Sequence, residues 1–500
     1  MFLLSVIALI FQALLLLFFL FFAFYNYRYQ IASLFPPKIK KTACSFTAKV
    51  AIIIVCRNEK AVICDTIQAC EQLTYANKTI IIGDDSNDTE TMKLLRPIAQ
   101  KYGCHRLNHH VAFGFDEAYE SERFVLFHRE KNIGFKAGNI KQIEGYLKAK
   151  GFEYLYILDA DWHPEPTAID QCLEVIEADP AIAYVQTCRN SYYGKWEHFR
   201  RCLGMMEESC YYVDLVGRQV LGEMILFTGC CALFRRSHLE AVGGFMPGHL
   251  TEDIDLSNRC YLAGYKGVYL NQVKNTGEVP PNYKAYRRQQ DRWTRGSARV
   301  LRDYFFTLMR SDKLSLRIKL SLIRQNAYFT VSIGTALSIV MALSVFLCEF
   351  WVPHILSEPW LFTEVIDWVS IVIPFAYLIF FSSILYLIIL VCKKREWRSL
   401  LYIPLVWWLN LSIIYTYFIA NLKGFQSRDN TWFLTPKTNR VRQKVYLQSA
   451  WGIRAVNLLS LVLITVMYGS LLRKEGVIFA LVLPYAISWI PAFMIGSLKS

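Results

Sequence analysis

The residues best suited to chemistry are paired carboxylates that follow apolar runs. Asp159-Ala160-Asp161 comes directly after Tyr154–Leu158. Two carboxylates separated by one residue can point toward one cation, and a hard divalent ion prefers oxygen ligands while keeping coordination positions for diphosphate oxygens. Asp159 and Asp161 are therefore the predicted metal-binding pair, and the neighbouring His163 is left out of the set. A turn or a helix cap is the structural alternative for such a motif.

A second acidic motif, Thr251-Glu252-Asp253, precedes a helical pattern that continues through Leu256 and Cys260. Thr251 is a suitable N-cap, and acidic residues in a first turn compensate the helix dipole. The functional interpretation makes Asp253 a general base, which accepts the proton of an acceptor hydroxyl as that oxygen attacks the anomeric carbon of a sugar.

The run Gln289-Gln290-Asp291-Arg292-Trp293 combines amides, a cation and an aromatic ring. A sugar stacks on an aromatic face through its C–H side, while Gln289 and Arg292 can bond its hydroxyls or a leaving diphosphate. We therefore predict that Gln289, Arg292 and Trp293 bind the acceptor. An interfacial anchor is the alternative for Trp293.

Two further segments suit a nucleotide. Asp84-Asp85-Ser86 follows Ile80–Gly83, where acidic side chains can bond a base or ribose, or form an Asx-turn. Lys131–Asn139 adds two glycines and Lys136 before a helical pattern, which suits an anionic nucleotide or a plain helix entry. Because the sequence has neither a GxGxxG motif nor a P-loop, a metal must hold the phosphates.

The elements that position these motifs are β-rich apolar runs alternating with amphipathic stretches. The runs are Val50–Val55, Thr79–Gly83, Phe124–Phe127, Tyr154–Leu158 and Ala181–Val185. Such alternation predicts an α/β domain with a mostly parallel sheet covered by helices. Ligands bind at the carboxyl ends of parallel strands, so the motifs beginning at Asp84 and Asp159 should face one crevice.

Composition favours an integral membrane protein. Apolar residues make up 54% and aromatic residues 15% of the 500 residues. Several charge-free runs have the length of a membrane span. The predicted parts are an N-terminal anchor at 1–27, a cytosolic domain at 40–325 with interfacial helices at its C-terminal end, and a membrane domain at 326–500 with spans at about 328–350, 368–392, 452–472 and 476–498.

Basic residues set the predicted orientation of the chain. They follow the first apolar run from Arg28 onward, which puts the N-terminus outside and the domain at 40–325 in the cytosol. The basic loop 422–450 then also belongs inside. The aromatic run 400–421 is accordingly predicted to lie in the interface or to re-enter rather than to cross.

The net charge of +14 raises the question of nucleic acid. Lipid headgroups and membrane topology account for basic loops in so apolar a chain, and no nucleic-acid partner is expected. The 14 cysteines form no CxxC pair. They are predicted to be reduced thiols, without a disulfide framework or a zinc site.

Taken together, the motifs resemble those of the processive family 2 glycosyltransferases, which include cellulose, chitin and hyaluronan synthases. The similarity is strongest to cellulose-synthase-like A and C type enzymes and their bacterial relatives, and covers about residues 48–325. The matching segments are Phe135-Lys136-Ala137-Gly138, Val185-Gln186-Thr187, Gly243-Gly244-Phe245, Thr251–Leu256 and the QQxRW run. Phe227–Cys231 departs from many relatives, which have more glycine or serine there, and leaves the acceptor contacts of that segment open.

The resemblance implies a GT-A (Rossmann-like) α/β domain inserted in a multi-span α-helical membrane protein. It also implies inverting transfer from a nucleotide sugar of the UDP-glucose or GDP-mannose type, bound with Mg²⁺ or Mn²⁺. The implied roles are nucleotide binding by Glu59, Asp84, Asp85 and Lys136, metal binding by Asp159 and Asp161, catalysis by Asp253, and acceptor binding by Gln289, Arg292 and Trp293. Trp432–Lys437 resembles a cytosolic gating loop, with Thr435 and Lys437 as its site residues.

The expected function is processive synthesis of a β-linked polysaccharide of glucan or mannan type. The growing polysaccharide would pass through the protein's own helices across a plasma (inner) membrane, or across a Golgi membrane in a eukaryote. A non-processive enzyme that adds one sugar to a lipid acceptor is the first alternative. A transporter or scaffold with structural Asp motifs is the second.

Overall fold

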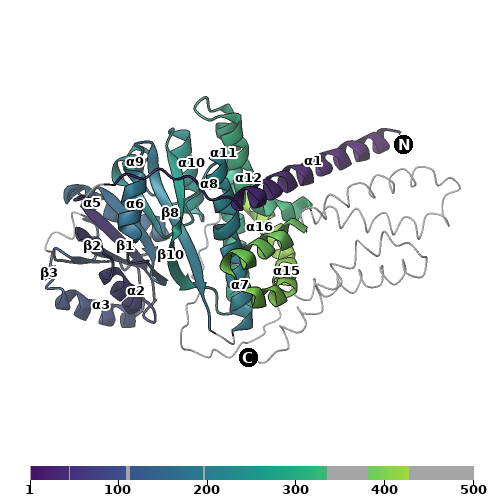
Figure 1. Cartoon of the computed structure of the whole chain (residues 1–500). Helices are drawn as coiled ribbons and strands as arrows, with labels where there is room; N and C mark the ends of the chain where they lie inside the picture. Colours follow the sequence, from purple (N-terminus) through teal and green to yellow (C-terminus); the bar gives the residue numbers. More distant parts are fainter. Residues whose placement is uncertain (1, 44–45, 108–112, 195–196, 335–380, 427–500) are drawn as a thin grey trace. The chain divides into compact units, whose positions relative to one another are not determined.

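The computed structural model describes residues 2–43, 46–107, 113–194, 197–334 and 381–426. The chain divides into two compact units. The larger contains Ala32–Asn326, and the smaller contains Met1–Ile31 and Ala327–Gln426 (Figure 1).

A ten-stranded sheet forms the centre of the larger unit, with strand order β3-β4-β5-β2-β1-β6-β9-β8-β10-β7. Its strands are β1 (Val50–Cys56), β2 (Lys78–Asp84), β3 (His105–Arg106), β4 (Glu117–Glu120), β5 (Phe124–His128), β6 (Tyr154–Asp159), β7 (Trp162–His163), β8 (Ile182–Tyr192), β9 (Ala232–Arg235) and β10 (Lys266–Glu278). Every apolar run predicted as a strand is one.

The sheet is mixed, so the prediction of a mostly parallel sheet holds for the long strands but not for the short ones. β5, β2, β1 and β6 are parallel neighbours, as are β8 and β10. The short β9 runs antiparallel to both β6 and β8, and β3, β4 and β7 add antiparallel edges. Such short strands carry too few apolar residues to be recognised as β-rich runs.

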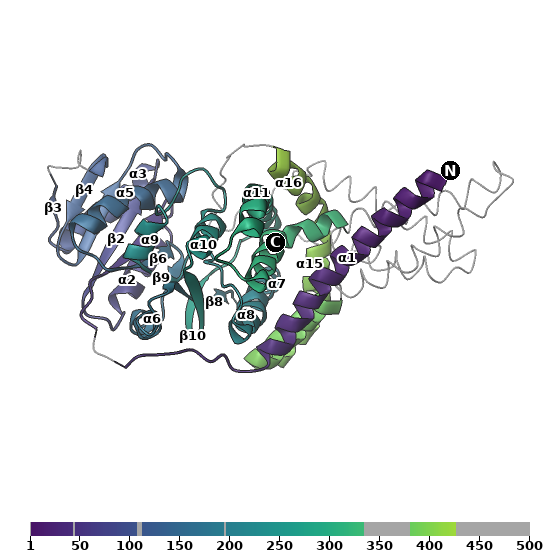
Figure 2. The same cartoon turned by 90° about the horizontal axis from the view of Figure 1, so that it is seen from above.

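Helices cover both faces of the sheet. Successive side chains of a strand point to opposite faces, so the apolar side chains of a strand such as β1 need cover on both. Ile52 and Ile54 of β1 pack on α2 (Ile63–Glu71), α3 (Thr89–Lys101) and α6 (Ala168–Ile176). Ala51 and Ile53 face the opposite way, toward α5 (Phe135–Ala149), α9 (Arg236–Ala241) and α10 (Glu252–Leu262). Figure 2 shows α5 and α6 on opposite sides of the sheet. Because both faces are covered, β1 is apolar throughout.

Further helices of this unit precede β9 or follow β10 in the chain. They are α7 (His198–Ser209), the π-helical turn η1 (Cys210–Asp214), α8 (Leu215–Leu221), α11 (Tyr283–Arg310) and α12 (Leu316–Asn326). Asn282 caps α11 by accepting a hydrogen bond from the backbone N–H of Ala285 at 2.9 Å. Residues 279–282 alone connect β10 to α11.

In the smaller unit, α1 (Phe2–Ser33) contains Ala13–Ser33, the one described helix long and apolar enough to cross a membrane. The side-chain amide of Gln30 donates to the backbone oxygen of Ser382 at 2.7 Å. The predicted spans at 328–350 and 368–392 lie partly outside the described residues, and those at 452–472 and 476–498 lie wholly outside. So do Thr435, Lys437 and the rest of the loop 427–450.

The predicted interfacial segment 400–421 is not one continuous helix. It comprises the second half of the 3₁₀ segment η4 (Trp397–Tyr402), all of α15 (Ile403–Ser412) and the first part of α16 (Ile414–Gln426). The buried Asn421 amide donates to the carbonyl oxygen of Phe329, within η2 (Tyr328–Thr330), at 2.8 Å. Its placement in the membrane interface stays a prediction.

Candidate functional site

Strand register brings the first two acidic motifs to one edge of the sheet. Cys56 at the end of β1 pairs with Asp84 at the end of β2, and Val55 pairs with Asp159 at the end of β6. Asp84 in turn pairs with His128 at the end of β5. The carboxyl ends of four adjacent parallel strands are therefore level, as the strand-end argument predicted.

Asp85 is the centre of a buried hydrogen-bond network. Arg129 donates to both of its carboxylate oxygens, from Nε at 2.7 Å and from Nη2 at 2.6 Å, and the Asn139 amide donates at 2.7 Å. Burial raises the pKa of Asp85, while the Arg129 guanidinium opposes the shift. Bidentate pairs of this kind are strong and specific in geometry. Asp85 is 3% exposed, so its orientation is set by these partners.

Asp84 is buried beside Asp85 and accepts a hydrogen bond from the Ser86 hydroxyl at 2.6 Å. Its other oxygen lies 2.7 Å from Nδ1 of His128. Burial lowers the pKa of His128, but the hydrogen bond and charge of Asp84 outweigh burial and the net shift is upward. We call Asp84, Asp85, His128, Arg129 and Asn139 the Asp85 network.

Glu59 follows β1 at the same sheet edge and is buried. Its carboxylate accepts a hydrogen bond from the backbone N–H of Arg57 at 3.3 Å. The predicted nucleotide residues Glu59, Asp84 and Asp85 thus all follow or end the adjacent strands β1 and β2.

Lys136, the fourth predicted nucleotide residue, contacts the metal motif instead. Its Nζ donates to Asp159 and, at 2.7 Å, to the carbonyl oxygen of Gly229. Burial lowers the pKa of Lys136, but the charges of Asp159 and Glu252 outweigh burial and the net shift is upward. The antiparallel β9 explains why Gly229 is present, since the segment before β9 lies at the end of β6.

The two glycines of the Lys131–Asn139 segment are required by its backbone conformation and close packing. Gly134 caps α5 with φ 70°, and a Cβ on Gly138 would lie 2.1 Å from the carbonyl oxygen of Ile133. The plain helix-entry interpretation therefore accounts for both glycines.

Asp159 and Asp161 differ in exposure. The Asp159 side chain is 36% exposed, whereas Asp161 is buried. The next residue, Trp162, is packed between Gly277 of β10 and the guanidinium of Arg189, which lies 4.0 Å from the centre of the indole ring. These contacts fix the turn that carries both carboxylates.

The donor chemistry of this pair fits a hard divalent ion. Within the described residues no group of three or more His, Cys, Asp or Glu side chains is placed to hold a metal. Mg²⁺ is commonly bound through one or two carboxylates together with substrate phosphates, so two aspartates are a sufficient protein contribution.

The Thr251-Glu252-Asp253 motif begins α10 as predicted, with Thr251 at the N-cap position. The Thr251 hydroxyl makes no hydrogen bond to any described residue, so the expected side-chain cap does not form. Burial and the adjacent Asp253 raise the pKa of Glu252 from 4.5 to about 7, against Lys136 and Arg292. Burial likewise raises the pKa of Asp253, against a hydrogen bond from the Ile254 N–H and the charge of Arg292.

Asp253 lies near the Lys136 contact. A Cβ added to Gly229 would be 3.4 Å from Oδ2 of Asp253, and Gly229 itself has φ 92°. Gly229, three residues before β9, is therefore close to Asp253 and is linked to Asp159 through Lys136. We call Lys136, Asp159, Glu252, Asp253 and Arg292 the Asp253 cluster.

The predicted acceptor residues lie on α11. Gln289, Arg292 and Trp293 are spaced i, i+3 and i+4, share one helix face and are half-buried. Burial lowers the pKa of Arg292, and the carboxylates of Glu252, Asp253 and Asp159 oppose the shift. Of the three predicted acceptor residues, Arg292 thus interacts electrostatically with the three carboxylates of the Asp253 cluster.

Gly296, one turn after Arg292, permits the close approach of α11 to α10. A Cβ there would lie 2.4 Å from Cγ2 and 2.7 Å from the hydroxyl oxygen of Thr251. Any larger side chain must push α11 away from the residue that precedes Glu252.

The sequence argument missed several residues of these two groups. Arg129 follows β5 just as Asp85 follows β2, so the strand-end rule could have found it. Asn139 ends the Lys131–Asn139 segment, but its contact with Asp85 spans 54 positions. Glu252 was treated as a capping residue, because nothing in a sequence shows that a first-turn carboxylate is buried.

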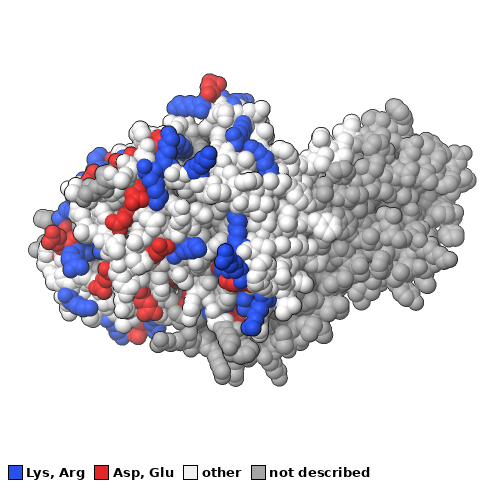
Figure 3. Space-filling model, viewed as in Figure 1, with Lys and Arg blue, Asp and Glu red and all other residues white. Residues whose placement is uncertain are grey.

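Charge on the visible surface is mixed. On the face shown in Figure 3, Lys and Arg are interspersed with Asp and Glu over the described part of the chain. The exclusion of nucleic acid stays a prediction.

The comparison with protein families decides the class. Residues 154–495 match the model of glycosyl transferase family group 2, and residues 51–243 match that of glycosyl transferase family 2. The chain belongs to the family 2 glycosyltransferases. The predicted family resemblance and the predicted enzyme class are confirmed.

Two plant relatives of this glycosyltransferase are similar over much of its length. It is 28% identical over 402 residues to a probable glucomannan 4-beta-mannosyltransferase 6 of Oryza sativa subsp. japonica, covering 77% of this chain and 62% of the relative. It is 29% identical over 268 residues to glucomannan 4-beta-mannosyltransferase 7 of Arabidopsis thaliana, covering 52% of this chain and 44% of the relative. The chain thus spans less than two thirds of either relative's length.

A solved structure shares the fold. The glycosyltransferase matches the mannosyltransferase PcManGT from Pyrobaculum calidifontis, solved in complex with GDP-Man and Mn2+, with a TM-score of 0.50 and 15% identity over 84% of this chain and 98% of that one. This likeness supports the predicted GT-A-like fold, with the mixed sheet described above.

Proposed function

We propose that this glycosyltransferase elongates a β-linked polysaccharide by inverting transfer from a nucleotide sugar. The main support is the Asp253 cluster. In it, Lys136 bonds both Asp159 and the carbonyl oxygen of Gly229, which lies close to Asp253 in space. The names of the plant relatives favour GDP-mannose as donor and a mannan-type product. UDP-glucose and a glucan product are the second choice.

The nucleotide binds along β1 and β2. Arg129 and Asn139 together occupy both lone pairs of Oδ1 of Asp85 and one of Oδ2, so Oδ2 has one further lone pair that can accept from a base N–H or ribose O–H group. The Asp84 carboxylate is enclosed, so Asp84 affects the nucleotide indirectly, by holding His128 in place. Glu59 completes the set from the end of β1.

Asp159 and Asp161 would hold Mg²⁺ or Mn²⁺, which would supply positive charge to neutralise the leaving diphosphate. Lys136 lies within bonding reach of Asp159 and adds a second positive charge at the same place. The Trp162 packing keeps the two carboxylates in position as the diphosphate leaves.

Asp253 accepts the proton of the acceptor hydroxyl as its oxygen attacks the anomeric carbon. The new C–O bond forms on the face opposite the bond to the diphosphate, which breaks and releases the nucleoside diphosphate, so the anomeric configuration inverts. Burial suits this role, because it raises the pKa of Asp253 and makes the carboxylate a better proton acceptor.

The acceptor terminus lies against α11, stacked on Trp293 and hydrogen-bonded by Gln289 and Arg292. We further propose that the domain at 40–325 is cytosolic, that residues 326–500 form a multi-pass membrane domain of the plasma or Golgi membrane, and that Thr435 and Lys437 belong to a loop that gates the site. The growing chain would leave through this domain.

Incubation of the purified full-length protein with GDP-mannose, UDP-glucose and other nucleotide sugars, followed by linkage analysis, tests the proposal. A β-linked polymer that lengthens before all acceptors are used is expected. A product with one added sugar on a lipid would refute processivity, and an α-linked product would refute inversion.

A further inference from the structure

Val185-Gln186-Thr187 in β8 belongs to the family resemblance but has no role in the transfer proposed above. Its middle residue, Gln186, is fully buried. A primary amide without hydrogen-bond partners is costly in a protein interior, and an apolar side chain of similar size would fill the same space. A buried glutamine is therefore informative when its amide bonds one particular segment of the chain.

Gln186 bonds the four residues Thr228–Cys231, which we call the Gly229 segment. Its Oε1 accepts a hydrogen bond from the backbone N–H of Thr228 at 2.9 Å. Its Nε2 donates to the carbonyl oxygens of Cys230 at 3.0 Å and of Cys231 at 3.1 Å. Because the acceptor end of the amide meets an N–H group and the donor end meets carbonyl groups, its orientation is fixed. One side chain thus holds the segment at both ends.

The Gly229 segment has an unusual backbone. Gly229 has φ 92°, and Cys231, which carries a Cβ, has φ 58°. Such a conformation is unfavourable for a non-glycine residue and persists only where surrounding contacts enforce it. The carbonyl oxygen of Cys231 also accepts from the backbone N–H of Thr187 at 3.0 Å and from its hydroxyl at 2.6 Å. Hydrogen bonds from β8 therefore hold the strained conformation in place.

The Gly229 segment contacts two members of the Asp253 cluster. The carbonyl oxygen of Gly229 accepts a hydrogen bond from Nζ of Lys136 at 2.7 Å, and a Cβ on Gly229 would lie 3.4 Å from Oδ2 of Asp253. Lys136 also bonds Asp159 of the metal motif. A shift of the segment would therefore move Lys136 relative to the carboxylates beside it.

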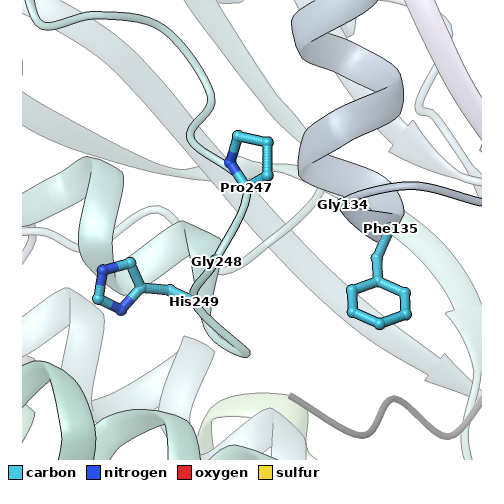
Figure 4. A pocket seen from close by; sticks show the side chains of 5 residues that line it. All are labelled: Gly134, Phe135, Pro247, Gly248 and His249. Atoms are coloured by element: carbon cyan, nitrogen blue, oxygen red, sulfur yellow. The ribbon is translucent and has the colours of Figure 1, made fainter. Parts of the chain in front are cut away.

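The helices that carry Lys136 and Asp253 begin on either side of a cavity of about 260 Å³. Figure 4 shows Phe135 at the start of α5 and the loop 247–249 before α10. Of the five lining residues only His249 has a polar side chain, and its ring is directed away from Phe135. The side-chain hydrogen bonds that hold the Gly229 segment between these helices come instead from β8 and η1.

We infer that Gln186 is a positioning residue for sugar transfer. Its amide holds the Gly229 segment in the conformation that places the Gly229 carbonyl against Lys136 and Gly229 itself beside Asp253. The inference rests on the proposed function, since the effect assigned to Gln186 is on the transfer step. Gln186 is fully buried, so it acts through the Gly229 segment rather than on the substrate.

Gln186→Met removes the amide and keeps a side chain of similar length. We expect kcat for transfer from labelled GDP-mannose or UDP-glucose to fall by about 10²-fold in the full-length protein, because small misplacements of reacting groups cost this much. The Kd values of GDP and UDP should stay within twofold, since the proposed nucleotide contacts lie on β1 and β2. If this variant does not fold, Gln186→Asn, with a shorter amide side chain, is measured instead. A kcat within twofold of the wild type would overturn the inference.

Tyr184→Phe is the matched control, because Tyr184 precedes Gln186 by two positions and shares its face of β8. Tyr184 is also fully buried, and its hydroxyl donates to the carbonyl oxygen of Ile225 at 2.6 Å, just before the Gly229 segment. We expect Tyr184→Phe to lower the thermal midpoint but to keep kcat within twofold. If both variants lost kcat equally at similar thermal midpoints, Gln186 would have only a structural role.

Cys231→Gly tests whether the strained conformation is the link. Glycine adopts a φ of this kind without the steric cost of a Cβ, so it depends less on the hydrogen bonds of Gln186. Combined with Gln186→Met, Cys231→Gly should therefore recover part of the lost kcat. Absence of any recovery would contradict the inference that Gln186 acts by holding this conformation.

Hydrogen exchange separates this inference from the proposed function. In Gln186→Met, the backbone amides of residues 226–233 should exchange faster than in the wild type, because the segment opens more readily. Unchanged exchange in this region would refute the inference alone. A wild-type protein that transfers sugar from no nucleotide sugar would refute the proposed function, whatever the exchange result.

Discussion

The negative charges of the carboxylates are compensated in different ways in the Asp85 network and in the Asp253 cluster. In the Asp85 network, one carboxylate is held by a bidentate arginine and an amide, and the other by a histidine and a hydroxyl. In the Asp253 cluster, the carboxylates of Asp159, Glu252 and Asp253 influence two cations, Lys136 and Arg292. The first is a closed set of hydrogen bonds, and the second gathers more negative than positive side chains.

This difference separates positioning from chemistry. A fully hydrogen-bonded buried network keeps its shape because each change leaves a buried group without a partner. Crowded carboxylates with raised pKa values are typical of sites where protons or cations are exchanged. We therefore expect substitutions in the network to act mainly on stability and those in the cluster mainly on rate.

Asp253→Asn should have the largest effect. Removing a general base lowers kcat by about 10²–10⁴-fold, while the folded state and the affinity for nucleoside diphosphate should persist. Initial rates with labelled donor and the Kd of the nucleotide measure this. Asp65→Asn, an exposed first-turn residue of α2, is the control and should keep full activity. A wild-type rate for Asp253→Asn would remove Asp253 as the base.

Arg129→Leu should be the most destabilising change in the network. It leaves the buried Asp85 carboxylate without its bidentate partner, a loss of about 3–5 kcal/mol in the free energy of unfolding. Denaturant titration measures the loss. Arg129→Lys keeps the charge but not the paired geometry and should recover part of the stability. If Arg129→Leu left the free energy of unfolding unchanged, the proposed contrast between the Asp85 network and the Asp253 cluster would be wrong.

Gly296→Ala tests how α11 is placed against α10. The added methyl group would lie 2.4 Å from Cγ2 of Thr251, and overpacking of this kind costs about 1–3 kcal/mol. We expect a lower kcat with little change in donor binding. In Gly145→Ala, the matched helix control, the nearest atom is 3.7 Å away, so that variant should be neutral or slightly more stable. Thr251→Ala should partly restore Gly296→Ala, and purely additive losses would contradict the contact.

Glu252→Gln should change the pH dependence of stability, the smallest effect. Because the folded state raises the pKa of Glu252 from 4.5 to about 7, it binds more protons than the unfolded state within that window. The free energy of unfolding should therefore fall as pH rises from about 4.5 to 7. Thermal midpoints across this range should decline less steeply in Glu252→Gln. An unchanged slope would place the titration elsewhere in the cluster.

Much of the fold could be predicted from the sequence because the buried parallel strands are continuous apolar runs. β1 and β6 are of this kind. β10 was missed because polar residues interrupt it, and its register with β8 shifts between Leu270 and Lys274. β9 was missed because four residues carry little periodic signal.

The candidate site could be predicted only where residue type and strand ends sufficed. The motifs beginning at Asp84 and Asp159 were placed at one edge by that rule, and the register of Asp84 and Asp159 agrees. The contact of Lys136 with Gly229 spans 93 positions, and it depends on the direction of β9. Close approaches such as Gly296 to Thr251 are set by packing, which a single sequence does not reveal.

The short connection after β10 has a consequence for timing. β10 pairs with Trp162 through Gly277, and residues 279–282 then lead directly to α11, which carries Gln289 and Arg292. The strand beside the metal motif and the helix of the acceptor residues are almost one continuous piece of chain. A displacement of the Asp159–Asp161 turn would therefore be passed along the backbone to α11, and under the proposed polymerisation it would couple release of the nucleoside diphosphate to movement of the acceptor.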